Sequence, residues 1–390
     1  MQLNIQYLSR LFQTSILAGL LLCFVSCSDD DTDPGTHLEV PSTYTFTRDG
    51  STSVSFSGQT DRLNMLAEMK GEVGKGDNGE EVDADALANM FANENTSFSD
   101  ADLNASTKQI ENKTFVADIQ FFKDLFQAAE LVSKDIVANS TAAEEGQAGM
   151  IERGTSGTFI SVNAKGWEFT QFVEKGLMGA LIYNQIFNTY LTDAEIGSDV
   201  DNVTILEGKN YTDLEHHFDE AYGYFGAPID YAVSDPDLTS DEDRFWVKYT
   251  HDVNAVYPIS EDLMKAYITA RTAIVNNDHA TKDVQVDAIY EMHELVAAGT
   301  AIHYINSALE DLNANDTGNL FHHLSEGYNF VKAIKYSPVA ALTSTQITTI
   351  LETDFGTDGN FWTASQESLN TAKSTLTTAY PKLAAVADDL

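Results

Sequence analysis

The chain has 390 residues, 43% of them hydrophobic, and its 60 acidic against 22 basic side chains give a formal net charge of −38. This length exceeds the size at which a single core usually stops growing, so we expect two domains. The negative charge argues against nucleic-acid binding and against electrostatic docking on anionic lipid, and it favours cations as ionic partners. Alternatively, the acidity only keeps the protein soluble.

The first 26 residues have the proportions of an export signal. The run ILAGLLLCFV at 16–25 is apolar or small throughout and follows Arg10, but it is too short to span a bilayer as a stable helix. Ser26-Cys27 resembles the cleavage and lipidation signal of bacterial lipoproteins, although Phe24 replaces the usual aliphatic residue. We therefore expect residues 1–26 to be a lipoprotein signal peptide and Cys27 to be an acylated anchor.

Two consequences follow from an acylated Cys27. The only other cysteine, Cys23, would leave with the signal, so no thiol would remain for a disulfide or for catalysis. The acidic run at 28–33 resembles the tag by which some Gram-negative bacteria send lipoproteins to the outer face of the outer membrane, or it is a solvated linker. The expected location is the outer membrane, with the protein lipid-anchored and exposed at the cell surface.

Residues 27–57 are expected to form a tether and a small β-hairpin. Aromatic and β-branched residues alternate on both sides of Asp49-Gly50, a dipeptide that favours a tight turn.

The period of apolar residues then changes to that of helices, in segments 115–138, 168–191 and 286–312. In the first of these, the predicted buried stripe consists of Phe115, Ile119, Phe122, Phe126 and Leu131. No strand pattern is evident after the hairpin. The predicted fold is therefore all-α, with helical bundles at 58–238 and 239–390 joined through the polar linker at 234–243.

Two loop-like segments invite functional interpretations that their details do not support. The segment 144–168 has five glycines but lacks the preceding strand and the GK[ST] of a phosphate-binding loop, so it is read as a loop between helices. The segment DLNANDTGNL at 311–320 begins like a calcium loop. However, Asp316 stands where the turn glycine belongs and His322 where the bidentate glutamate belongs, so a helix end is the better interpretation.

A short pattern occurs twice. HHFDEAYGYF at 216–225 and HHLSEGYNF at 322–330 share the doubled histidine, the glutamate and two aromatic positions, which indicates an internal duplication. On a helix, His217 with Glu220 and His323 with Glu326 have i, i+3 spacing, which places each pair within reach of one metal ion. If the duplicated helices face each other, the four residues form a metal site. The alternative is a polar layer between helices that needs no ligand.

The residues around this expected metal site complete the candidate set. Iron or zinc suits histidine and glutamate ligands. The candidate ligand-binding residues around the ion are Asp219, Tyr222, Tyr224 and Tyr328.

The sequence resembles the imelysin-like proteins, in particular a group of surface lipoproteins of unknown function. The resemblance is carried by the HxxE pairs and by GQAG at 146–149, KGLMGA at 175–180 and DEAYGYFG at 219–226. It implies two helical bundles related by duplication, a site at their interface, and links to iron uptake and to a peptidase label. Imelysins carry GxHxxE, whereas Glu215 and Phe321 stand at the glycine positions here.

Three functions remain open from the sequence. The first is a non-catalytic lipoprotein, facing the cell surface or the periplasm, that binds a metal ion or metal chelate at the inter-domain site, with an outer-membrane uptake complex as its partner. The second is a zinc metallopeptidase in which His217, Glu220 and His323 form the ligand set, although no HExxH motif is present and no strands suggest the usual α/β scaffold. The third is a metal-free nutrient-binding or adhesion lipoprotein.

Overall fold

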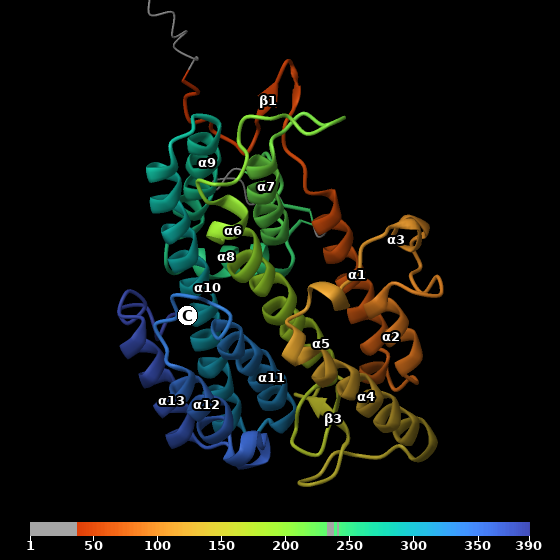
Figure 1. The fold of residues 1–390 in the computed structure, drawn as a ribbon. Helices are drawn as coiled ribbons and strands as arrows, with labels where there is room; N and C mark the ends of the chain where they lie inside the picture. The colour runs from red at the N-terminus through yellow and green to blue at the C-terminus, as the bar shows by residue number, and fades with distance from the viewer. Residues whose placement is uncertain (1–36, 232–237, 240–241) are drawn as a thin grey trace, which may run out of the picture. The chain divides into compact units, whose positions relative to one another are not determined.

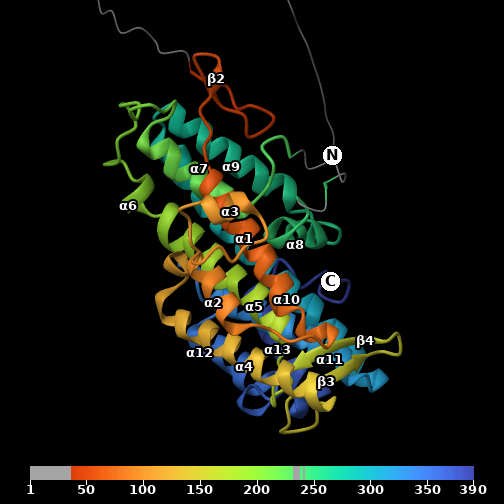
Figure 2. The same cartoon turned by 90° about the vertical axis from the view of Figure 1, so that its right-hand side faces the viewer.

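The computed structural model describes residues 37–231, 238–239 and 242–390. The expectations for the signal peptide, for Cys27 and for most of the linker at 234–243 lie outside these residues. Leu38–Leu390 forms one compact unit, drawn in Figures 1 and 2. No helix in the described part of the chain is both long enough and apolar enough to cross a bilayer.

The N-terminal hairpin forms as predicted. Strand β1 (Thr47–Arg48) pairs antiparallel with β2 (Ser51–Thr52). Between them Asp49 has φ +52° and Gly50 has φ +77°. Two successive positive φ angles are the signature of the turn that suits the twist of a hairpin, and Asp-Gly adopts them at little cost.

The remainder is almost wholly helical, which confirms the all-α prediction. The α-helices of the first half are α1 (Ser57–Val73), α2 (Ala84–Ala92), α3 (Ala101–Ala105), α4 (Ile119–Asn139), α5 (Phe169–Leu177), α6 (Asp193–Ile196) and α7 (Asp213–Phe225). Short 3₁₀ turns lie at η1 (Gly76–Asn78), η2 (Glu111–Lys113) and η3 (Val116–Asp118).

The predicted helix at 115–138 corresponds to η3 and α4, and its buried stripe is partly wrong. Phe122 and Phe126 are fully buried, as expected. Leu131, in contrast, is 69% exposed and Phe115 is 36% exposed. The buried stripe of α4 continues to its last turns through Ala129, Ser133 and Ile136. Leu131 lies five residues after Phe126 and therefore on a different face of the helix.

A second hairpin corrects the prediction that no strands follow the first. Strand β3 (Gly149–Arg153) pairs antiparallel with β4 (Thr158–Val162), with Ile151 opposite Ile160. Gly154 and Gly157 adopt positive φ in the connection. The segment read as a loop between helices is therefore a hairpin, and its glycines serve the turn rather than a phosphate.

The predicted helix at 168–191 lies at the centre of the unit. It begins as α5 and continues as two π-helical stretches, η4 (Met178–Tyr183) and η5 (Ile186–Tyr190). Every residue of α5 and η4 is buried. Helices α1, α4 and α11 surround α5, so that even its polar residues Thr170, Gln171, Glu174 and Lys175 are buried.

In the second half the α-helices are α8 (Phe245–Asn254), α9 (Ser260–Val275), α10 (His279–Ala314), α11 (Thr317–Ile334), α12 (Ser344–Thr349) and α13 (Gln366–Ala379). The π-helical stretch η6 (Ile350–Asp354) and the 3₁₀ turns η7 (Thr357–Gly359) and η8 (Phe361–Thr363) lie between α12 and α13.

Helix α10 contains the predicted helix at 286–312 and exceeds it at both ends. The Asp278 side chain caps its start by accepting from the backbone N–H of Thr281. Asn315, in the left-handed conformation, ends it and is followed at once by α11. The predicted helix end at 311–320 is therefore confirmed. Helices α8, α9, α11 and α13 all pack on α10 (Figures 1 and 2).

Helices of the two expected bundles also pack on each other within the compact unit. Helix α11, from the second half, contacts α5 and η4 from the first half, and α9 contacts α7. The division into bundles at 58–238 and 239–390, with duplication of one from the other, stays a prediction that superposition of the halves would test.

Candidate functional site

Both copies of the doubled histidine lie on helices, as the spacing argument requires. Helix α7 begins with a capping box, in which Thr212 and Glu215 satisfy each other's backbone N–H groups. Asp316 caps the start of helix α11, and its side chain accepts from the N–H of Asn319. The local sequence therefore determines where each copy starts to be helical.

In the first copy, His217 and Glu220 contact different partners. The Nδ1 atom of His217 lies 2.8 Å from the backbone oxygen of Glu195 and 2.9 Å from its carboxylate. The carboxylate of Glu220 accepts hydrogen bonds from Gln59 on α1, at 2.8 Å, and from the Tyr190 hydroxyl, at 3.3 Å. The pair at i, i+3 is thus divided between two neighbouring segments.

The second copy differs from its prediction in the same way. The Nδ1 atom of His323 lies 2.6 Å from the Asp311 carboxylate near the end of α10. Glu326 instead contacts Lys175, at 3.4 Å, and the Nε2 atom of His322, also at 3.4 Å. The histidine that meets Glu326 is therefore the one at i, i+4 and not the one at i, i+3.

The predicted four-ligand set is not assembled. Among residues 37–231, 238–239 and 242–390, no group of three or more His, Cys, Asp or Glu side chains could hold a metal ion. Helix α7 packs on α1 and α9, whereas α11 packs on α5 and α10, so the two copies present their acids to different helices. The set of His217, Glu220 and His323 considered for a zinc peptidase fails for the same reason.

Asp219, predicted to bind a ligand, belongs to a buried ion network. Its carboxylate accepts from the Tyr44 hydroxyl and from Nε of Arg271, both at 2.8 Å. Arg271 also contacts Glu215, at 3.0 Å, and Arg48 contacts Glu215 from the hairpin, at 2.8 Å. Burial raises the pKa of Asp219, although Arg271 opposes the shift. The network fastens the N-terminal hairpin to α7 and α9.

The three predicted ligand-binding tyrosines lie in the core. Tyr222 is fully buried, stacks on Tyr44 with ring centroids 3.7 Å apart, and donates to the backbone oxygen of Pro228. Tyr224 is fully buried, and Tyr328 is 7% exposed and packs against the ring of Phe172. Their burial places them among packing residues rather than along a cavity wall.

Sequence reasoning missed the charged residues of α5. Lys175 is 6% exposed, and its Nζ lies 2.7 Å from Glu174 and 3.4 Å from Glu326. Burial alone would lower the pKa of Lys175, but the two carboxylates outweigh it and raise the pKa above the usual value. Burial likewise acts to raise the pKa of Glu174, and Lys175 and Lys70 outweigh it to lower that pKa. Both groups are therefore held in their charged forms.

His322 extends this network toward the start of α5. Its Nδ1 lies 2.7 Å from Glu168 and its Nε2 lies 3.4 Å from Glu326. The i, i+4 spacing of His322 and Glu326 was the sequence signal that could have identified this pair. We call the set Glu168, Glu174, Lys175, His322 and Glu326 the α5–α11 ion network.

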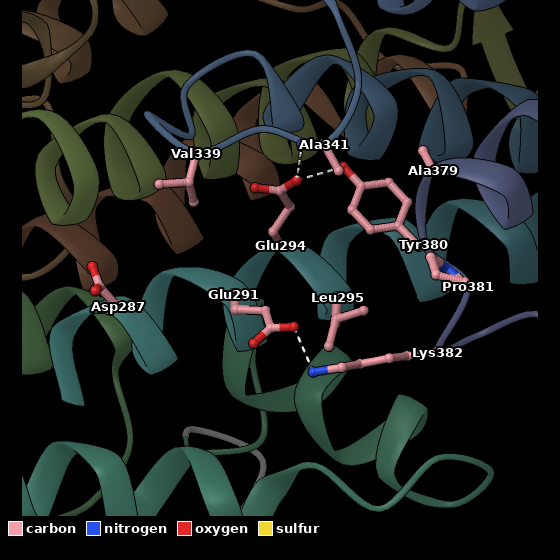
Figure 3. Close-up of a pocket in the computed structure, with 10 residues that line it drawn as sticks. All are labelled: Asp287, Glu291, Glu294, Leu295, Val339, Ala341, Ala379, Tyr380, Pro381 and Lys382. Carbon is pink, nitrogen blue, oxygen red and sulfur yellow. Dashed lines mark hydrogen bonds and ion pairs between the residues drawn. The ribbon is translucent and has the colours of Figure 1, made fainter. Parts of the chain in front are cut away.

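A cavity of about 490 Å³ lies beside α10, away from the predicted site residues. Figure 3 shows its lining. Helix α10 contributes acidic residues and Leu295, the segment after α11 contributes Val339 and Ala341, and the end of α13 with the segment after it contributes Ala379 to Lys382. We call it the Glu294 cavity. Its size and its largely apolar walls are typical of pockets for small molecules.

The polar groups of the Glu294 cavity differ in burial. Glu294 is 4% exposed, and one of its oxygens accepts from the N–H of Ala341, at 2.6 Å, and from the Tyr380 hydroxyl, at 2.7 Å. Burial, together with Glu294, raises the pKa of Tyr380, which therefore stays a phenol donor. At the rim, Glu291 and Lys382 form an ion pair between half-exposed side chains.

The comparison with protein families identifies the family of this chain. A family model described as a domain of unknown function (DUF4856) spans residues 41–381. The chain belongs to this family. No curated protein and no solved structure matches it.

The DUF4856 match covers nearly all of the described fold. It includes the N-terminal hairpin, both doubled histidines, the α5–α11 ion network and the part of the Glu294 cavity up to Pro381. Cys27 lies before the matched residues. The description of the DUF4856 family names no activity, so function has to be inferred from the chemistry of the chain itself.

The Nδ1 atom of each histidine in the two copies contacts a backbone oxygen or an acid. None of these histidines lines the Glu294 cavity. The Glu294 cavity offers apolar walls and a few polar groups, which is sufficient to hold and orient a small ligand.

Proposed function

We propose that this protein is an exported lipoprotein, anchored in the outer membrane through acylated Cys27 and exposed at the cell surface, which binds a small ligand without transforming it. The observation that carries the binding function is the Glu294 cavity. The sequence at the N-terminus supports the anchor, and mass spectrometry of the mature N-terminus checks it: a chain that still begins at Met1 would contradict it.

The cavity supports binding because of its walls and its rigidity. Leu295, Val339 and Ala341 offer apolar surface, and each square ångström that a ligand covers contributes about 25 cal/mol. The hydrogen bonds of Glu294 to Ala341 and Tyr380 tie α10 to both other walls. A ligand would therefore meet a site that is already ordered, which reduces the entropy lost on binding.

The resemblance to imelysin-like proteins belongs to this proposal, and it connects the chain to iron uptake. A metal chelate presents an organic surface, so it fits a cavity of this size better than a bare ion does. The lack of a metal-holding group among the described residues also counts against a bare ion as the ligand. An outer-membrane uptake complex would be the partner that receives the ligand.

A thermal-shift screen of the full chain tests the proposal. The compounds should include cationic, neutral and anionic organic molecules, ferric chelates, and Zn²⁺ and Fe²⁺ alone. A ligand present at about 100 times its Kd stabilises the folded state by about 2.7 kcal/mol, which raises Tm by roughly 3 to 4 °C for a chain of this size. If no compound raises Tm in a concentration-dependent way, the binding function is contradicted.

A further inference from the structure

A second cavity adjoins the Glu294 cavity. Its volume is about 380 Å³, and it lies between α9 and α10. Glu291, Leu295 and Lys382 line both cavities. The ion pair between Glu291 and Lys382, drawn as a dashed line in Figure 3, therefore lies at the boundary between the two cavities.

The acidic residues of the Glu294 cavity lie in a row on α10. Asp287, Glu291 and Glu294 are four and three residues apart, so they share one face of the helix. At 1.5 Å of rise per residue, Asp287 and Glu294 are about 10 Å apart along the axis. Lys382 is the only basic residue in the lining of this cavity. Two ammonium groups on one aliphatic chain would complement such a row.

The innermost acid retains capacity to accept a hydrogen bond. One oxygen of Glu294 accepts from Ala341 and Tyr380, while the other accepts only from the Ser337 hydroxyl, at 2.6 Å. A carboxylate oxygen offers about two lone-pair sites. The second oxygen can thus accept from one more donor, such as an ammonium group.

The rim pair is a replaceable contact. The side chains of Lys382 and Glu291 are 53% and 55% exposed, and such surface pairs contribute little stability. A ligand ammonium can therefore replace Lys382 as the partner of Glu291 at small cost. In Figure 3 the Lys382 side chain extends across from the segment after α13 to reach Glu291.

We propose that the Glu294 cavity binds an aliphatic diamine. One ammonium contacts Glu294, the other contacts Asp287 and Glu291 in place of Lys382, and the hydrocarbon chain lies against Leu295, Val339 and Ala379. The proposal rests on the proposed binding function and names its ligand class. The net charge of −38 supports it, because a strongly negative protein attracts cations from a distance.

Calorimetric titration with three probes of equal length tests the ligand class: 1,6-diaminohexane, 1,6-hexanediol and hexanedioate. We expect the diamine to bind most tightly. Glu291→Gln should weaken diamine binding about two- to fivefold, the size expected for one half-exposed ion pair. Lys382→Met should strengthen it, because the competing ammonium is gone. Glu310→Gln, at an exposed position of α10 outside the cavity, makes the same charge change and should have no effect.

The outcomes distinguish a failure of the diamine inference from a failure of the proposed binding function. If hexanediol binds as tightly as the diamine, the cavity binds ligands but the amine class is wrong. If Glu291→Gln and Glu310→Gln weaken diamine binding equally, the attraction is non-specific and the inference is overturned. If none of the three probes binds although the thermal-shift screen finds another ligand, the diamine is overturned and the proposed function survives.

Discussion

His293 shows how strongly burial acts on a single residue. It is fully buried, its Nε2 lies 2.8 Å from the Tyr267 hydroxyl, and its Nδ1 has no partner. The rings of Tyr183, Phe187 and Phe225 surround it. This apolar burial lowers the pKa of His293 from 6.5 to about 3. The native protein therefore keeps this imidazole neutral where an unfolded chain would protonate it.

The pH dependence of stability follows from that shift. Between pH 6.5 and about 3 the unfolded state binds a proton that the native state does not, so the contribution of His293 is complete above pH 6.5 and is lost as the pH falls. His293→Gln keeps a partner for Tyr267 but does not titrate. Chemical denaturation at pH 7 and pH 4 should show that the variant loses about 3 kcal/mol less than the wild type over this interval.

A surface histidine provides the control for that comparison. His251 is 40% exposed in its side chain, so His251→Gln should give a pH profile parallel to that of the wild type. If the pH profile of His293→Gln is also parallel to that of the wild type, His293 is not buried in its neutral form and the prediction is contradicted.

Helix α5 carries a buried ion pair whose removal should lower the stability of the fold. Replacing Lys175 by Met removes the ammonium that faces Glu174 and Glu326 and leaves two carboxylates in a buried setting. Breaking a buried ion pair from one side typically costs 3 to 5 kcal/mol. We expect a loss of about that size in the free energy of unfolding, measured by urea denaturation.

A double variant separates charge from packing on α5. Glu174 keeps Lys70 at 2.9 Å in Lys175→Met, whereas Glu326 loses its ammonium partner. Adding Glu326→Gln should therefore recover part of the loss. Lys123→Met, at a partly exposed pair with Glu111, should cost much less. Equal losses for Lys175→Met and Lys123→Met would contradict the account of the α5–α11 ion network.

Local sequence patterns predicted the secondary-structure elements of this fold better than they predicted which elements pack together. Asp49-Gly50 predicted the first hairpin because its turn is a property of two residues. The second hairpin was missed because Met150 to Val162 lies in a glycine-rich segment whose alternation was not weighed. Spacing placed the doubled histidines on helices. It could not show that Glu326 meets His322 and Lys175, because that depends on how α5 and α11 pack.

At the scale of the whole molecule, the cavity and the charge act together. None of the predicted site residues lines the Glu294 cavity, because a cavity forms where α10, the segment after α11 and the end of α13 meet (Figure 3). Because these segments lie far apart in the sequence, local sequence patterns do not show that they form one cavity. The acidic surface adds a long-range attraction for cations, which should weaken as salt is added, since the Debye length falls to about 8 Å at 0.15 M.

The most direct test of the account is calorimetry of a variant in which a large side chain fills the Glu294 cavity. The ligand is the compound that gives the largest thermal shift. Ala341 is exposed at the cavity wall, so Ala341→Trp should occupy the cavity without disturbing the core, and Ala101→Trp provides the same change at an exposed site elsewhere. The account predicts that the wild type and Ala101→Trp bind alike and that Ala341→Trp gives no binding heat. Binding of equal affinity by Ala341→Trp would contradict it.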